Sequence, residues 1–284
     1  MTDATGSDPA SRTHEGRSRG RHLIVIGAVL CGGMVILAML SPWLGLQDPS
    51  LQLAGAALEA PSGEHLLGTD KYGRDVFSRV LHGGRLTLLF TGIALLGVVA
   101  AGTVIGAIAA SAPRVIDTAA TSVFDLLVSF PAVIVALALA GTFGPSMVIV
   151  LGGVMLVMWA PFARLSRALV RQAMASRSAQ TARALGSGPG ILLVREIWPR
   201  LRGPVVVLAA VEAGQLITIV AGLSFLGLGA QPPSPEWGAM LQEGRATLWS
   251  APHVLLGPGL AVLATVLGLT CLGEGMRDYL DAPT

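Results

Sequence analysis

Residues 178–200 read SAQTARALGSGPGILLVREIWPR and separate two long apolar stretches of the chain. Eight arginines lie between positions 164 and 202, in and around this segment. An arginine at the centre of a bilayer costs about 2.5–3.5 kcal/mol, so eight would cost on the order of 20 kcal/mol. Residues 164–203 therefore stay outside the bilayer, and they fix the side on which the flanking apolar stretches begin and end.

The composition is that of an integral membrane protein. The chain has 284 residues, of which 52% are hydrophobic and 13% are charged, and its mean hydropathy is +0.68. Soluble domains carry about 25% charged residues. Cys31 and Cys271 both lie in apolar stretches, so they indicate neither a disulfide framework nor a metal site.

Six apolar stretches approach the roughly 20 residues that a spanning helix needs. They cover residues 23–40, 86–110, 119–140, 147–162, 205–228 and 254–272. We expect the fourth to continue as a helix beyond the bilayer. The first is too long for a cleaved signal peptide, and no small-residue cleavage site follows it.

The positive charges predict the orientation. With the N-terminus inside, fourteen arginines lie in inner segments, against five arginines and lysines in outer segments. Because cytoplasmic loops are enriched in these residues, both termini are expected in the cytoplasm. The fold class is therefore an all-α membrane protein with six transmembrane helices, N-in and C-in.

The remaining organisation follows from these spans. Residues 1–22 are polar and are expected to form a disordered cytoplasmic tail, with no nucleic-acid partner. Residues 23–85 hold the first transmembrane helix and an outer loop with a surface helix. Residues 86–280 hold a five-helix core that includes a cytoplasmic loop at 164–203.

The sequence carries no recognisable catalytic or cofactor site. The single lysine, Lys71, does not follow a glycine-rich loop, whereas a phosphate-binding loop needs its lysine directly after the glycines. Neither a zinc-protease motif nor a calcium loop occurs. We therefore expect a protein that is not an enzyme and binds no cofactor or metal of its own.

Three residues are candidates for a solute or ion pathway. Asp125 and Glu212 lie in apolar stretches, where a carboxylate is costly and is a functional candidate by default. Each could handle protons or cations, or could make a structural hydrogen bond or line a vestibule. For Asp125, Arg114 or Arg164 is a possible ion-pair partner. Ser224 lies in a Gly222-Leu-Ser-Phe-Leu run that lacks the second glycine of a nucleophile elbow, so it is kept only as a pathway candidate.

The opening segment predicts two short helices joined by a glycine turn. Ser178 can cap a helix that ends at Leu185, Gly186 fits the left-handed position after it, and Pro189 fits the start of the second helix. Pro199 is expected to end that helix. Small alanines and glycines beside arginines suit docking into a partner's groove. A hairpin lying flat on the bilayer surface would have a similar pattern.

The outer segment before the second span carries charges of alternating sign. Asp70, Arg74, Asp75 and Arg79 allow ion pairs at helical spacing, with apolar residues at 76, 77, 80 and 81. The pattern predicts an amphipathic helix at the outer surface. Its charges are expected to be solvated or paired between subunits rather than to bind substrate.

Three motifs resemble one family. Gln180-Thr-Ala-Arg-Ala-Leu-Gly186 followed by Ile197-Trp-Pro199 resembles the EAA loop of binding-protein-dependent ABC importer permeases, and departs from it at positions 180, 181 and 198. His65–Arg79 resembles a signature of the dipeptide, oligopeptide and nickel subfamily, and residues 223–238 resemble its fifth-span exit. The signature residues are Gly68, Thr69, Asp70, Gly73, Arg74, Asp75 and Arg79.

The resemblance implies the second, C-type, permease subunit of such an importer, with the type I ABC importer fold, in the bacterial inner membrane. The implied partners are a sister permease, two cytoplasmic subunits that use ATP and magnesium, an extracytoplasmic substrate-binding protein and membrane lipid. The implied ATPase-coupling residues are Gln180, Ala182, Arg183, Leu185, Gly186, Ile197 and Pro199. Peptides are the expected substrate, and nickel or another metal chelate is the alternative. The residues alone also leave open a stand-alone ion-coupled transporter or a membrane scaffold.

Overall fold

The computed structural model describes residues 9–53 and 55–281, with side chains from residue 18 to residue 280. The described helices are α1 (Pro9–Leu40), η1 (Ser41–Trp43), α2 (Val76–Ser111), α3 (Arg114–Ser129), α4 (Ala132–Phe143), α5 (Met147–Ala175), α6 (Arg177–Ala184), α7 (Pro189–Leu192), η2 (Leu193–Ile197), α8 (Trp198–Phe225), α9 (Trp237–Gly244), η3 (Arg245–Thr247) and α10 (His253–Asp281).

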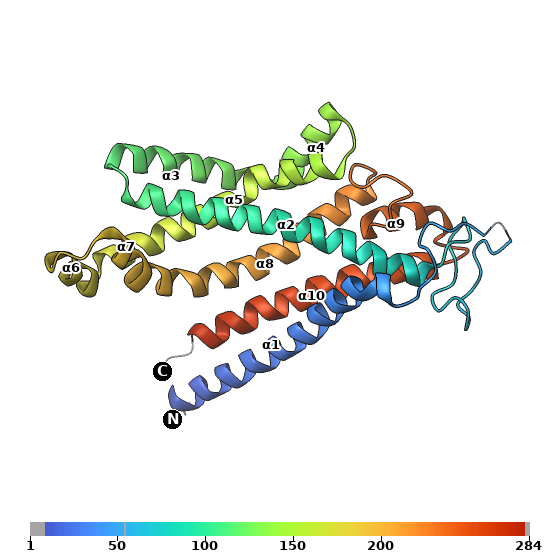
Figure 1. Ribbon diagram of the computed structural model, residues 1–284, viewed down its shortest axis with the longest axis horizontal. Coiled ribbons are helices and arrows are strands. Elements are labelled where there is room, and N and C mark those ends of the chain that lie inside the picture. The colour runs from blue at the N-terminus through green and yellow to red at the C-terminus, as the bar shows by residue number, and fades with distance from the viewer. Residues whose placement is uncertain (1–8, 54, 282–284) are drawn as a thin grey trace, which may run out of the picture.

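Five of the described segments are long and apolar enough to cross a membrane: 18–43, 76–111, 147–175, 189–225 and 253–280. The start of α1, the end of α10 and the α6–α7 pair lie at one end of the bundle, and α9 and the 41–75 loop lie at the other (Figure 1). This arrangement matches the predicted topology, in which the arginine-rich loop and both ends of the chain share one side.

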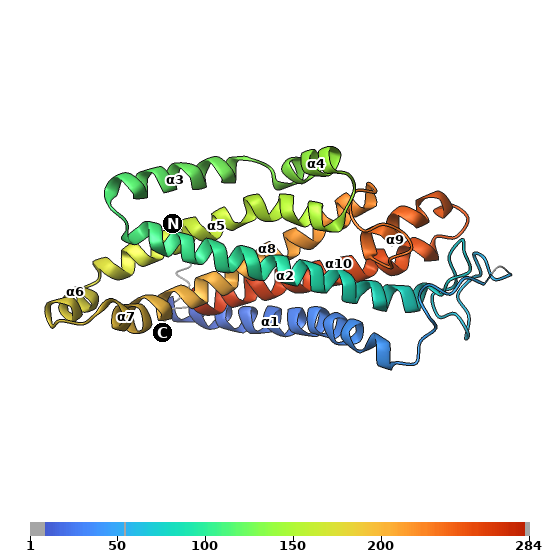
Figure 2. The ribbon, with the colours of Figure 1, turned by 45° about the horizontal axis from the view of Figure 1, so that its top comes forward.

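The expected third span is a broken one. α3 and α4 meet at an angle of 79° across Phe130 and Pro131, and together they form one bent pair. Proline lacks a backbone N–H and restricts the residue before it to extended conformations. Phe130 is extended accordingly, with φ −88° and ψ 125°. The prediction of one continuous helix over 119–140 is therefore wrong, and the sixth span exists only as this bent pair (Figure 2).

The predicted disordered tail is helical from Pro9 onward, because α1 extends to that residue. α1 packs along α10, and the two backbones approach closely where Gly20 faces Gly275. Packing of this kind stabilises a helix whose sequence alone does not favour it. Residues 1–8 of the predicted tail lie outside the described part of the chain.

The core lies between α2, α5 and α8. Its centre includes the buried residues Val98, Val154, Phe162 and Leu216. α2 approaches α5 through two glycines: a Cβ added to Gly102 would lie 2.3 Å from the Trp159 carbonyl, and one added to Gly106 would lie 2.2 Å from the Ala163 carbonyl. Small residues four apart permit this close contact of two spanning helices.

Candidate functional site

α6 forms the first half of a helical hairpin over residues 177–197 and ends in a glycine turn. Gly186 has φ +82°, the Ser187 N–H donates to the Ala182 carbonyl (2.9 Å), and the Gly186 N–H donates to the Arg183 carbonyl (2.9 Å). This pair of bonds is the Schellman motif, which requires a left-handed residue, so Gly186 has the predicted role. The N-cap is Ser176 instead of the predicted Ser178, because the Ser176 hydroxyl accepts from the Ala179 N–H (3.3 Å).

The tip of this hairpin projects away from the bundle. Leu185 is 81% exposed, and a Cβ added to Gly186 would meet no atom within 4 Å. Arg183 is exposed and Ala182 is half-buried, while the exposed Gln180 side chain donates to the Ala175 carbonyl (3.1 Å). An apolar side chain at a protruding tip, next to a guanidinium, has no partner within the described chain.

The second half of the hairpin continues directly into a spanning helix. Pro189 begins α7 as predicted, but Pro199 does not end it, because the helical segment runs from Pro189 to Phe225. Residues Leu193–Ile197 form a π-helical turn just before Pro199. The wider turn accommodates a proline that would clash with the carbonyl four residues earlier in a regular α-helix. Ile197 packs partly against the core, whereas Pro199 is exposed and lines the cavity described below.

A polar network ties the two halves of the hairpin together. The Ser178 hydroxyl donates to the Glu196 carboxylate (2.6 Å), and Arg200 pairs with the same carboxylate (3.4 Å). Arg200 also donates to the Ser176 hydroxyl (2.9 Å) and to the Ala173 carbonyl (3.2 Å) at the end of α5. This network was not predicted, although Glu196 and Arg200 have the spacing of a helical ion pair. The hairpin is thereby linked to both α5 and α8.

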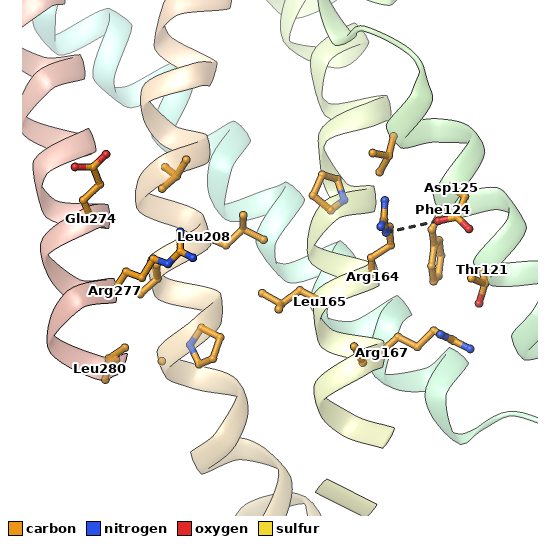
Figure 3. A pocket seen from close by; sticks show the side chains of 18 of the residues that line it. Thr121, Phe124, Asp125, Arg164, Leu165, Arg167, Leu208, Glu274, Arg277 and Leu280 are labelled. Carbon is orange, nitrogen blue, oxygen red and sulfur yellow. Dashed lines mark ion pairs between the residues drawn. The ribbon is translucent and has the colours of Figure 1, made fainter. Parts of the chain in front are cut away.

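A cavity of about 1300 Å³ lies between α3, α5, α8 and α10 (Figure 3). Asp125 and Arg164 line it from α3 and α5, and Glu274 and Arg277 line it from α10. The Arg164 Nε lies 3.5 Å from the Asp125 Oδ1, which is one of the two pairings foreseen for this acid. The other lining residues are mainly apolar, so the walls carry a few charges of both signs on an apolar surface.

The other two pathway candidates do not line this cavity. Glu212 is half-buried on α8, and it is absent from the lining although its neighbour Val211 belongs to it. Ser224 is fully buried at the outer end of α8, where it packs against Gly229 and Gly238. A Cβ added to Gly229 would lie 1.9 Å from the Ser224 Oγ. Ser224 therefore belongs to a tightly packed joint in this structure.

Another acid, Asp117, was not among the predicted candidates, because it lies in the first turn of α3, just before the expected third span. It is buried, and its carboxylate accepts two bonds from Arg167 (2.5 and 2.8 Å) and one from Arg171 (2.5 Å). A bidentate arginine–carboxylate pair is strong and directional. This contact holds α3 against α5 just before the hairpin begins.

The outer signature forms a loop closed by a short antiparallel bridge, and not a surface helix. Gly68 has φ +70° and Gly73 has φ +73°. Thr69 and Asp75 form an antiparallel bridge. α2 begins only at Val76, and the Asp75 carboxylate caps it by accepting from the Ser78 N–H (2.6 Å). The glycines of the signature are thus required by backbone turns, and the predicted amphipathic helix over this segment is wrong.

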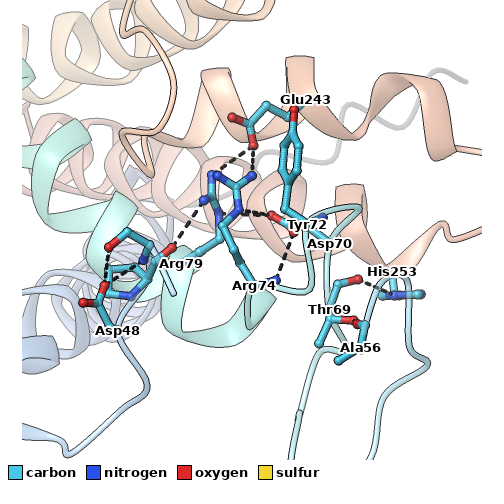
Figure 4. A network of polar contacts seen from close by, with 11 residues as sticks. Asp48, Ala56, Thr69, Asp70, Tyr72, Arg74, Arg79, Glu243 and His253 are labelled. Carbon is cyan, nitrogen blue, oxygen red and sulfur yellow. Dashed lines mark hydrogen bonds and ion pairs between the residues drawn. The ribbon is translucent and has the colours of Figure 1, made fainter. Parts of the chain in front are cut away.

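The charges of the signature are buried in a network within the chain (Figure 4). The Arg74 Nε lies 2.6 Å from Asp70, Arg79 lies 3.0 Å from Glu243 of α9, and Arg74 also contacts Glu243. Arg74 and Arg79 are each 1% exposed. The prediction that these charges are solvated or paired between subunits is therefore wrong, because they are buried and paired within the chain. Their partner Glu243 is distant in sequence, so the local charge pattern does not reveal it.

A further buried acid, Glu236, stabilises the same end of the molecule. Glu236 caps α9 by accepting from the Ala239 N–H (2.9 Å), and the Thr87 hydroxyl donates to it (3.2 Å). Burial raises the pKa of the Glu236 carboxyl, although its hydrogen bonds oppose the shift. The contact with Thr87 fixes α9 on α2.

Comparisons with known proteins agree with this architecture. The family described as "Binding-protein-dependent transport system inner membrane component" matches residues 102–283. A dipeptide transport system permease protein of Alkalihalophilus pseudofirmus is 35% identical over 259 residues, which cover 91% of this chain and 85% of that protein. Glutathione transport system permease proteins are 39% identical in Pectobacterium atrosepticum, over 78% of this chain and 74% of that protein, and 35% identical in Escherichia coli, over 93% and 88%.

The family match covers the bent span, the hairpin and the cavity, and the similarity to the relatives extends over most of the chain. The chain is a multi-pass protein of the bacterial inner membrane, and it belongs to the family of inner membrane components of binding-protein-dependent transport systems.

Proposed function

We propose that this chain is one of two permease subunits of an ATP-driven peptide importer. A sister permease would complete the translocation path, two cytoplasmic subunits would hydrolyse ATP with magnesium, and an extracytoplasmic binding protein would deliver the solute. The names of the relatives support a peptide substrate over a metal chelate. The observation that carries the proposal is an exposed hairpin joined rigidly to the helices that line the cavity.

The hairpin has the properties of a coupling element. Leu185 and Gly186 present an apolar tip to the cytoplasm, and Arg183 can pair with an acid on a partner's surface. The Glu196–Arg200 network and the Ser178 hydroxyl keep the hairpin from moving independently of α5 and α8. A partner that pulls the tip would therefore move two walls of the cavity together.

One face of α8 supports a second permease subunit. Val211, Gln215, Thr218 and Gly222 form an exposed row along this helix, although the helix is long and apolar enough to span the bilayer. A side-chain amide facing lipid tails lacks hydrogen-bond partners. We infer that Gln215 faces a sister permease or the path between the subunits. An ion-coupled transporter is less well supported, because the matching family is one of binding-protein-dependent transport systems and the relatives are named as permease proteins of transport systems.

The proposal is tested at the tip of the hairpin. Leu185→Asp changes a side chain that is 81% exposed, so the fold should be kept, while docking of the ATP-binding subunit should weaken. Loss of an interface anchor costs about 2 kcal/mol, or about 30-fold in affinity. Gly186→Leu should likewise insert normally and abolish transport, whereas Gly186→Asn, which tolerates the left-handed conformation, is the matched control. Undiminished binding of the ATP-binding subunit by Leu185→Asp would refute the docking role.

A further inference from the structure

We propose that Asp125 and Arg164 form a binding site for zwitterionic solutes in the cavity wall. Arg164 would take the carboxylate of the solute and Asp125 would take its ammonium group. This inference rests on the proposed function and names the chemical form in which a peptide would be held. Peptides with both termini free belong to this class.

The availability of this ion pair is the first argument. Asp125 is 59% exposed and Arg164 is 51% exposed in their side chains, and both line the cavity. Their separation of 3.5 Å is longer than a strong charge-assisted hydrogen bond. An exposed ion pair at this distance is weak, so a solute can separate Asp125 from Arg164.

The second acid of α3 provides a direct contrast. Asp117 lies two helical turns before Asp125 and also pairs with arginines of α5, yet it is buried and accepts three bonds of 2.5–2.8 Å from Arg167 and Arg171. That pair has the geometry of a structural contact. Because the same two helices already have this contact, the Asp125–Arg164 pair is not needed to hold them together.

The chemistry of the pair favours solutes with both charges. The Arg164 guanidinium has five N–H donors in a planar fork, and the Asp125 carboxylate has two acceptor oxygens, so each retains capacity beyond their mutual contact. A zwitterion replaces one weak ion pair with two. A solute with a single charge that separates the pair would leave either the acid or the arginine without its partner, so it gains less than a zwitterion does.

The surrounding surface fits a peptide of variable side chains. Phe124, Val128 and Leu165 line the cavity beside the pair, and Leu208 faces it from α8. A cavity of about 1300 Å³ is roomy for a short peptide with water. The charges would therefore fix the two termini, while the apolar wall accepts different side chains.

Binding of tritiated alanyl-alanine to the purified complex of both permeases and the ATP-binding subunits tests the site directly. N-acetyl-alanyl-alanine and alanyl-alanine amide serve as competitors that lack one charge each. The wild-type complex should prefer the zwitterion by about tenfold, the value expected for one charge-assisted hydrogen bond. Asp125→Asn should lose the discrimination against the acetylated peptide, and Arg164→Gln should lose the discrimination against the amide. Arg202→Gln and Asp278→Asn, which do not line the cavity, are the matched controls.

Several outcomes would overturn the site. An absence of saturable binding would overturn it, as would unchanged discrimination in both variants. Failure of the variants to assemble with the sister permease would also overturn it, because the pair would then belong to the subunit interface. ATP-dependent peptide uptake is measured separately on the same preparations. A complex that imports peptides while the variants bind like the wild type keeps the proposed function and refutes only this site, and a complex without ATP-dependent uptake refutes the proposed function itself.

Discussion

Replacement of Glu243 by glutamine should strongly destabilise the outer end of the protein. Glu243 accepts from both Arg74 and Arg79, and these two guanidinium groups are each 1% exposed. With Asp70 as the second acid, the buried network has no net charge. Glu243→Gln keeps the size and one acceptor oxygen but leaves one positive charge uncompensated. Removing one partner of a buried pair costs about 3–5 kcal/mol, and the retained oxygen places our expectation near 3 kcal/mol.

Unfolding by SDS in mixed micelles, followed by tryptophan fluorescence, measures this loss. The double variant Arg79→Met/Glu243→Met removes one charge of each sign, so it should lose less stability than Glu243→Gln alone. A free energy of unfolding for Glu243→Gln within about 0.5 kcal/mol of the wild type would refute the reasoning, because changes of that size are typical of exposed sites. A double variant that is as unstable as the sum of the single variants would also contradict it.

Two further changes probe the packing and the titration of the fold. Gly106→Leu should lower the amount of folded protein in the membrane, because its Cβ would lie 2.2 Å from the Ala163 carbonyl and overpacking costs about 1–3 kcal/mol. Quantitative blotting of membrane fractions measures this amount. Gly92→Leu is the control, because a Cβ at Gly92 on the same helix would meet no atom within 4 Å. Burial raises the pKa of Glu236, so the native state holds its proton more tightly than the unfolded state. Stability should therefore fall as pH rises above the unfolded value of about 4.3 toward the native pKa, and Glu236→Gln should remove this fall. Parallel profiles of the unfolding midpoint against pH for both proteins would contradict the assignment.

The apolar spans could be predicted, as could the common side of the two chain ends and the arginine-rich loop, because these features depend on local properties of the sequence. Apolar length and the position of arginines decide which segments cross the bilayer. The turn at Gly186 could be predicted because few other residues tolerate a φ of +82°. The break at Pro131 could also have been foreseen, since proline restricts the residue before it. The prediction that Pro199 ends the second helix of the hairpin was wrong, because the π-helical turn before it accommodates the proline and the helix continues.

The buried charges could not be predicted, because their partners are distant in sequence. Asp70, Arg74 and Arg79 have the spacing of an exposed helix, and only the fold brings Glu243 onto them. The fate of the pathway candidates likewise depends on helix rotation: Asp125 lines the cavity, whereas Ser224 packs against glycines. An apolar stretch with few polar residues does not specify this rotation.

Uptake of radiolabelled alanyl-alanine into proteoliposomes tests the central claim most directly. The vesicles would contain this chain, its sister permease and the ATP-binding subunits, oriented with the α6–α7 hairpin inside, and the binding protein would be added outside. We predict uptake that requires ATP inside and the binding protein outside, and that is lost with Leu185→Asp. Uptake by this chain alone, driven by an ion gradient and indifferent to ATP and to the substitution at Leu185, would contradict the account.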